Sequence, residues 1–185
     1  MRPVPAYAVL DGPVLDTVED ELAGDSAEGA LDKAFARFED SQPALSNYVS
    51  ELLGKPLDET ALALGYFLTI AVWLAFERRF DQRLGPVTDD ALEATEQALR
   101  LEEELRAEHS EEPLDVDDVV AMEQPAVLRF VHGHVDAALE VQSDGQGEVD
   151  VDDVHAVYRA VIVLTLALSQ AVRPPAGGKS QEFLA

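Results

Sequence analysis

The chain of 185 residues has no cysteine and few positively charged residues. Without cysteine it has no disulfide bonds, no thiolate metal ligands and no cysteine nucleophile. Lysine and arginine number 13 against 37 aspartates and glutamates, so the formal net charge is −24. This charge repels phosphate backbones and anionic lipid surfaces, and we therefore expect no nucleic acid and no membrane among the partners. The same acidity suits a basic protein partner or a divalent cation. It also suits a protein without such a partner, whose charge keeps it soluble or adapts it to high salt.

The sequence also lacks a recognisable secretory signal and a long apolar run. Its start, MRPVPAYAVLDG, has one arginine and a short apolar stretch interrupted by prolines, so we expect a cytoplasmic protein. Two stretches are nearly free of charge, Ala61 to Phe76 and Ala160 to Leu168. Both are shorter than the roughly 20 apolar residues that a membrane-spanning helix needs. We interpret them as central helices of a soluble bundle, since such helices are apolar on all sides.

Strand signals are missing as well: the chain has neither period-two alternation nor the Asn-Gly pairs of hairpins. Apolar residues recur instead at helical spacing, which predicts an all-α protein with a bundle of about six helices. A length of 185 residues with 47% hydrophobic residues is enough for one domain with a sizeable core. We place this domain at residues 15–172, between a poorly ordered N-terminus, residues 1–14, and a flexible tail, residues 173–185.

Two Gln-Pro pairs, at Pro43 and Pro125, each open an amphipathic helix, and the two helices look alike. Apolar residues follow both prolines at the same helical offsets, with His134 in the place of Leu52. Proline suits a first helical turn, because its missing N–H has no intrahelical partner there. Further on, matching positions hold the following residues: Tyr66, Ile70 and Leu74 in the first copy, and Tyr158, Ile162 and Leu166 in the second. We therefore predict two related helical hairpins, residues 27–83 and 115–172, with residues 61–83 and 151–172 as the central pair of helices.

The second copy has a longer loop, QSDGQGEVDVDD, at residues 142–153. With glycine at its sixth position and oxygen-bearing side chains at most others, it resembles the calcium loop of EF-hand and dockerin-type modules. Carried over from that family, the ligands of a weak calcium site are Gln142, Asp144, Gln146, the carbonyl of Glu148, Asp150 and Asp153. The sequence departs from the family with an amide at the first position and a short aspartate at the last. The alternative is a turn followed by a helix cap, which favours the same residue types without metal.

The histidines do not match a known metal-binding motif. His132 and His134 are two residues apart, so they point to different sides of a helix. His132 and Asp136, four residues apart, form either an exposed pair or half of a metal site. No histidine has a glutamate three residues before it, which excludes the Glu-x-x-His pattern of di-metal helical bundles. His134 lies on the inward stripe, and we interpret it as a core residue.

Three hypotheses for the function follow, and none has an identified catalytic residue. The first is a non-catalytic interaction or scaffold protein that uses its acidic faces or a groove to bind a basic protein or a second copy of itself. The second is a calcium-binding module that uses the loop at residues 142–153. The third is an enzyme with a dispersed site, whose pocket holds His134, His155 and Arg159. Motifs for phosphate, dinucleotide or nucleophile-elbow chemistry are missing from the sequence.

Overall fold

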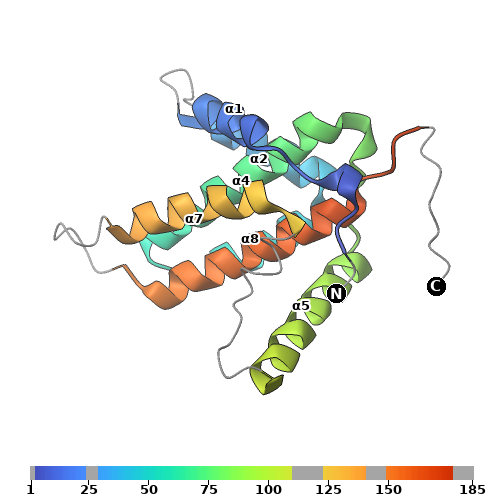
Figure 1. The fold of residues 1–185 in the computed structure, drawn as a ribbon. Coiled ribbons are helices and arrows are strands. Elements are labelled where there is room, and N and C mark those ends of the chain that lie inside the picture. Colours follow the sequence, from blue (N-terminus) through green and yellow to red (C-terminus); the bar gives the residue numbers. More distant parts are fainter. Residues whose placement is uncertain (1–2, 24–28, 110–122, 141–148, 177–185) are drawn as a thin grey trace.

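The computed structural model describes residues 3–23, 29–109, 123–140 and 149–176 (Figure 1). These ranges contain seven α-helices and two short 3-10 helices, η1 and η2. The elements are η1 (Ala6–Ala8), α1 (Gly12–Ala23), α2 (Ala30–Ser41), α3 (Pro43–Leu53), α4 (Glu59–Phe80), η2 (Asp81–Arg83), α5 (Asp89–His109), α7 (Pro125–Glu140) and α8 (Val151–Ala171). The described residues include no strand beyond an isolated bridge between Leu84 and Val172. The prediction of an all-α protein is confirmed.

Helices α4 and α8 lie against each other in the middle of the molecule, and the other helices pack around them (Figure 1). They run parallel, because their starts meet at one end and their last residues at the other. At the start, the Asp150 N–H donates to Asp58 Oδ2 at 3.0 Å, and each of these two aspartates caps its own helix. At the far end, Leu84 pairs with Val172 in the isolated bridge.

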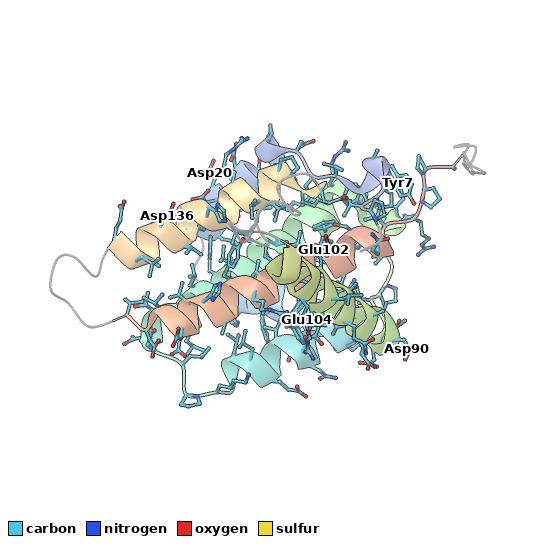
Figure 2. The ribbon with its side chains drawn as sticks, turned by 60° about the horizontal axis from the view of Figure 1, so that its bottom comes forward. Tyr7, Asp20, Asp90, Glu102, Glu104 and Asp136 are labelled. Carbon is cyan, nitrogen blue, oxygen red and sulfur yellow. The ribbon has the colours of Figure 1, made fainter. Side chains whose placement is uncertain are left out.

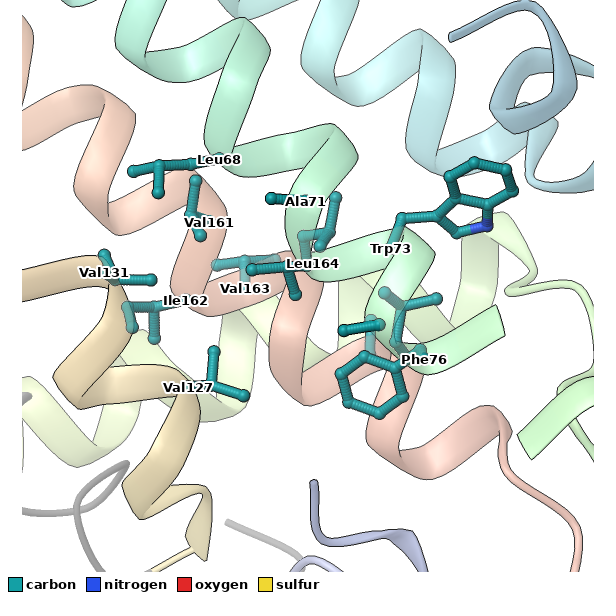
Figure 3. Packing of buried hydrophobic residues seen from close by; sticks show 14 of the residues in the cluster. Leu68, Ala71, Trp73, Phe76, Val127, Val131, Val161, Ile162, Val163 and Leu164 are labelled. Carbon is teal, nitrogen blue, oxygen red and sulfur yellow. The ribbon is translucent and has the colours of Figure 1, made fainter. Parts of the chain in front are cut away.

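The sequence of α4 and α8 explains their central position. Both helices are apolar on nearly every side, so only a place surrounded by other helices keeps their side chains from water. Trp73, Phe76, Ile162 and Leu164 are almost completely buried; in Figure 3, Trp73 points away from α8, and it packs against Phe38 of α2. By length and composition alone, both helices also qualify as membrane spans. In their most apolar windows, however, 61% and 72% of the residues are buried inside the molecule.

One glycine allows the close approach of α4 to its neighbours. A Cβ atom on Gly65 would lie 2.9 Å from Leu53 Cδ2 and 3.1 Å from Val157 Cγ2. Real Cβ atoms avoid such distances, so a larger residue here requires the side chains of Leu53 and Val157 to move. The sequence signal for this contact is a small residue inside an otherwise bulky apolar run.

The sequence predicts about six helices, and the described residues contain seven. The additional one is α1. Its buried side chains, Leu15 and Val18, stand among aspartates and glutamates, so its apolar stripe is too narrow to recognise in the sequence. Asp11 precedes the helix and accepts a hydrogen bond at Oδ1 from the backbone three residues later, at 3.4 Å. The residues before it, for which the sequence predicts loose order, place Ala8 and Leu10 in the core.

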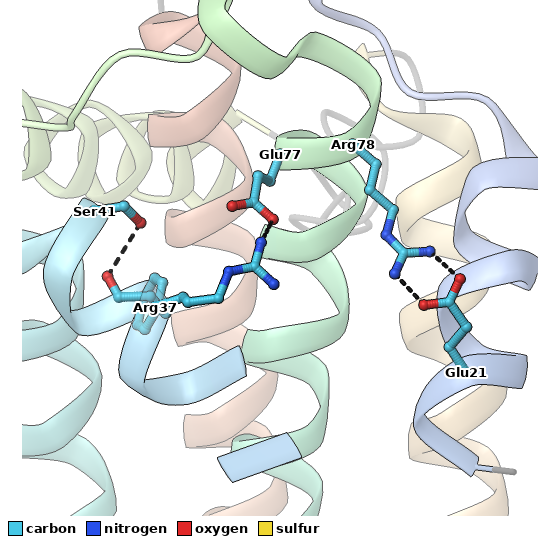
Figure 4. A network of polar contacts seen from close by, with 6 residues as sticks. Glu21, Arg37, Ser41, Glu77 and Arg78 are labelled. Carbon is cyan, nitrogen blue, oxygen red and sulfur yellow. Dashed lines mark hydrogen bonds and ion pairs between the residues drawn. The ribbon is translucent and has the colours of Figure 1, made fainter. Parts of the chain in front are cut away.

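Ion pairs connect the basic end of α4 to α1 and α2 (Figure 4). Arg78 pairs with Glu21 of α1, and Arg37 of α2 pairs with Glu77. The hydrogen bond from Arg78 holds the pKa of the Glu21 carboxyl below its ordinary value. Both pairs are partly exposed, and pairs of this kind contribute at most about 1 kcal/mol, less in high salt. They therefore orient α1 and α2 more than they stabilise the fold.

The glutamines of the two Gln-Pro pairs are buried, and each binds the segment before an α-helix in the other half of the chain. Gln42 donates from Nε2 to the Gly85 carbonyl at 3.1 Å and accepts at Oε1 from the Val87 N–H at 2.8 Å. The amide thus satisfies two buried backbone groups that lie two residues apart. Each such group is costly to bury without a partner.

Gln124 makes the same arrangement with the N-terminal segment. It donates from Nε2 to the Ala8 carbonyl at 2.9 Å and accepts at Oε1 from the Leu10 N–H at 2.9 Å. Its Nε2 also donates to Ser169 Oγ on α8 at 2.8 Å. We call these two sets of contacts the glutamine clamps. They explain why the N-terminal residues are packed despite their proline-rich sequence.

Replacing Gln124 with leucine should lower the free energy of unfolding by about 2 kcal/mol or more, because each buried backbone group left unpaired costs about 1–3 kcal/mol. Gln42→Leu should cost a similar amount, since it also removes the partners of one N–H and one carbonyl. The control is Gln97→Leu on the exposed side of α5, with an expected change below about 0.5 kcal/mol. Urea unfolding followed by circular dichroism compares the three. A Gln124→Leu variant as stable as the control would contradict a stabilising clamp.

Candidate functional site

The three residues predicted to share one pocket line three different hollows. His134 lines a hollow of about 540 Å³ between α4 and α7. His155 lines one of about 420 Å³ between α7 and α8. Arg159 lines one of about 280 Å³ between α3, α5 and α8. The structure therefore does not bring these three side chains together, and each hollow has its own chemistry.

The hollow between α7 and α8, named here the α7–α8 hollow, combines apolar walls with convergent polar groups. Its residues are His132, Val135, Asp136 and Leu139 from α7, and Val151, Val154, His155 and Tyr158 from α8. Each helix contributes positions i, i+3, i+4 and i+7, which form one face of a helix. A volume of about 420 Å³ is in the range of small-molecule sites.

Tyr158 forms the inner wall of this hollow. Its side chain is buried, with 8% exposure, and its hydroxyl lies 3.2 Å from His132 Nε2. A buried tyrosine hydroxyl needs such a partner, since it would otherwise lose its hydrogen bonds to water. On the other side, the His155 ring is nearly parallel to the Tyr158 ring, at 9° and 6.3 Å between centroids. Two imidazoles from different helices thus flank one phenol ring.

Asp136 adds a negative charge to the same hollow. It is exposed on α7, one helical turn after His132 (Figure 2). The sequence predicts that His132 and Asp136 share a helical face, and the hollow contains both of them. Sequence reasoning did not join them to His155 and Tyr158. The shared i, i+3, i+4, i+7 spacing on the two helices was the available signal, but it does not say which faces meet.

His134 occupies an aromatic setting at the edge of the core. Its ring lies between Phe67, at 4.9 Å between centroids, and Phe130, at 4.5 Å. Its Nε2 is buried without a hydrogen-bond partner among the described residues, and the nearest carboxylate oxygen, Glu19 Oε1, is 3.7 Å away. Burial lowers the pKa of the imidazole, and the charge of Glu19 opposes this shift. The setting matches a core histidine with a carboxylate in reach.

Arg159 lies in a hollow that carries both signs of charge. Tyr48, Lys55 and Glu96 line it as well. Burial, and then the charge of Glu96, raises the pKa of Tyr48 to about 12, while Arg159 opposes the shift. Glu51 lines the hollow too, so a neutral tyrosine, two cations and two carboxylates are close together. Such a mixture of charges is consistent with a structural ion pair for Arg159.

Most of the predicted calcium loop lies outside the described residues, including Gln142, Asp144, Gln146 and Glu148. The two described ligands act in capping. Asp150 Oδ1 accepts from the backbone N–H of Asp152 at 2.9 Å, and Asp153 Oδ2 accepts from the Asp58 N–H at 2.8 Å. Within the described ranges, no three or more His, Asp or Glu side chains are arranged to hold a metal ion. Calcium binding stays a prediction.

Three comparisons with known proteins give no indication of the function. No protein-family model, no curated protein and no solved structure matches the chain. The α7–α8 hollow combines four polar side chains with four aliphatic ones, and apolar walls with a few polar groups are the usual form of a ligand site.

Replacing His134 with leucine, the residue at the same offset after Pro43, should reduce the loss of stability in mild acid. The unfolded chain takes up a proton near the ordinary histidine pKa of 6.5, whereas burial lowers the pKa in the folded chain. His134 therefore costs no stability above this pH, and a loss develops as the pH falls from there through the folded-state value. Urea unfolding at a series of pH values measures the difference between variant and wild type.

A second variant, Glu19→Gln, separates burial from charge. Without the carboxylate that raises the pKa of His134, the loss of stability in this pH range should become larger than in the wild type. Identical pH profiles for wild type and His134→Leu would show that the imidazole is not held in its neutral form by the fold.

Proposed function

We propose that the protein is a non-catalytic interaction module that binds a basic protein through its acidic helix α5. The observation that supports this is the position of the helix. Its first half packs on α3 and α8 through Leu92 and Leu99, which are buried. Its second half extends away from the other helices (Figure 1). A projecting helix is accessible from several sides, as a docking element requires.

The surface of α5 suits a basic partner with an apolar pocket. Asp90, Glu93 and Glu104 are exposed along it, and Figure 2 shows Asp90 and Glu104 on the helix. Among them, Leu101 is 56% exposed, the second-highest value among the large apolar residues described as exposed. Acidic residues steer a basic partner toward the surface, and an apolar side chain then adds buried area. The net charge of −24 strengthens this attraction at low salt.

Charge reversal on α5 tests the proposal. The variant carries Asp90→Lys, Glu93→Lys and Glu104→Lys, and the control carries Asp16→Lys, Asp20→Lys and Asp40→Lys at exposed positions of α1 and α2. Both change the net charge equally. Partners captured from a lysate of the source organism and quantified by mass spectrometry should be lost, by about tenfold or more, only with the α5 variant. Equal loss in both would indicate attraction to the overall charge, and the proposal for α5 would then be wrong.

We also infer that the chain is an internal duplication, with units at residues 3–84 and 85–172. These units are longer than the repeat that the sequence predicts, since they add α1 and α5. The reciprocal glutamine clamps support this: Gln42 of the first unit binds the segment before α5, and Gln124 of the second binds the segment before α1. The matching caps Asp58 and Asp150 support it as well.

The contacts between helices follow the same correspondence. Helix α1 packs on α4 and α7 in the way that α5 packs on α8 and α3. At the starts of α1 and α5, Asp11 and Thr88 each accept a hydrogen bond from the backbone three residues later. A twofold relation with α4 and α8 as partners accounts for all these pairs. Self-association, expected from the sequence, is a separate proposal that sedimentation velocity checks.

A further inference from the structure

We propose that the α7–α8 hollow binds a small organic amine with a ring-sized apolar body. This site is distinct from the acidic surface of α5 and does not depend on it. The hollow supplies three things that such a molecule needs: apolar walls, aromatic rings and one carboxylate. All three come from side chains that line the hollow.

The walls fit the apolar body of the ligand. Val135 and Leu139 come from α7, and Val151 and Val154 come from α8. These four aliphatic side chains line the two sides of a space of about 420 Å³. A single ring with a short chain fills only part of this space, so no rearrangement of the helices is needed for entry. Val151, at 58% exposure, gains the most from being covered.

The rings and the carboxylate favour a positive charge. Asp136 is the one carboxylate that lines the hollow, and no lysine or arginine is among the described residues around it. The Tyr158 ring adds electron-rich surface, which attracts ammonium groups. The net charge of −24 raises the local concentration of cations and repels carboxylate ligands. The hollow at Arg159 differs here, since Lys55 and Arg159 both line it.

The first unit of the proposed duplication provides a comparison. Aligning the helix starts places Ser50 at the position of His132 and Ala63 at the position of His155. The matching tyrosine, Tyr66, stacks on Phe35 of α2 at 4.8 Å and its hydroxyl lies 3.3 Å from Asp32. Only the second unit therefore surrounds its tyrosine with two imidazoles.

The difference between the units extends to the charge. Gly54 stands where the second unit has Asp136. His132, Asp136 and His155 thus stand at positions where the first unit has small residues. Packing alone does not require them, since the first unit folds with Ser50, Gly54 and Ala63 in these places. This comparison rests on the proposed duplication, whereas the geometry of the hollow does not.

Nuclear magnetic resonance titration of the full chain tests the site. The probe is phenethylamine, compared with phenylacetate, which has a similar ring and the opposite charge, and with ethylamine, which has the charge and no ring. At about 0.3 M NaCl, long-range attraction to the polyanion is largely screened. We expect saturable shifts of the His132 and His155 ring signals with phenethylamine, and binding at least about tenfold weaker for the other two.

Two variants locate the binding. Asp136→Asn should weaken phenethylamine binding by about fivefold or more, because it removes the charge partner. His155→Ala, which installs the residue of the first unit, should weaken it as well. Both residues are exposed, so the fold is expected to persist, and circular dichroism checks this. The matched control is Asp20→Asn on α1, an exposed carboxylate outside the hollow, with no change expected.

Several results would overturn the proposal. Equal binding of phenethylamine and phenylacetate would show that the carboxylate does not select the charge. Equal binding of ethylamine would show that the apolar walls are not used. Shifts that do not saturate, or that Asp136→Asn and Asp20→Asn reduce alike, would indicate general attraction to an acidic surface. Each outcome leaves the proposal for α5 unaffected, because that proposal depends on different residues.

Discussion

The fold depends on the contact between two helices that have almost no polar side. A helix that is apolar all round has to be enclosed, and α4 and α8 enclose each other only along one line, so the other helices must cover the rest. The two helices are also parallel, as the contacts at both of their ends require. Parallel neighbours cannot be joined by a short turn. Helix α7 runs back along α8: Gln124, directly before α7, binds Ser169 near the end of α8, and Leu139 lines the same hollow as Val151 at the start of α8.

Apolar burial is non-directional, so it does not by itself fix how the peripheral segments lie. The glutamine clamps add direction, since an amide satisfies an N–H and a carbonyl only in one orientation. Each clamp joins the start of one helix, α3 or α7, to the segment that precedes another helix, α5 or α1. The acidic surface destabilises the compact chain, because its charges repel one another. Specific buried hydrogen bonds are thus most valuable in a chain whose surface favours expansion.

The class of the fold and the central helices could be predicted because their signals are local. Ala61 to Phe76 is too apolar for an exposed element, and Pro43 and Pro125 mark helix starts without reference to anything distant. Helix α1 was missed since its stripe consists of few residues among many acids. The glutamines before the prolines were recognised as helix boundaries, but their hydrogen-bond partners lie more than 40 positions away. A sequence pattern does not contain that pairing.

The sequence predicts the two helical faces of the candidate site separately, but not that they meet. The spacing puts His132 and Asp136 on one face of α7, and the same spacing puts His155 and Tyr158 on one face of α8. Which face of a helix turns toward a given neighbour depends on how all the side chains pack, and no single stretch of sequence carries that information. The same reason explains why three residues predicted to share one pocket, His134, His155 and Arg159, line separate hollows.

The reciprocal clamps mean that neither half of the chain can complete its own core. Gln42 needs residues 85–87 from the second half, and Gln124 needs residues 8–10 from the first. A separately produced half would expose a buried amide together with an apolar helix face, so it could reach the same packing only by pairing with another polypeptide. Covalent linkage turns that pairing into an intramolecular event, which makes the folded state independent of protein concentration. Cutting the chain between α4 and α5 would restore the dependence.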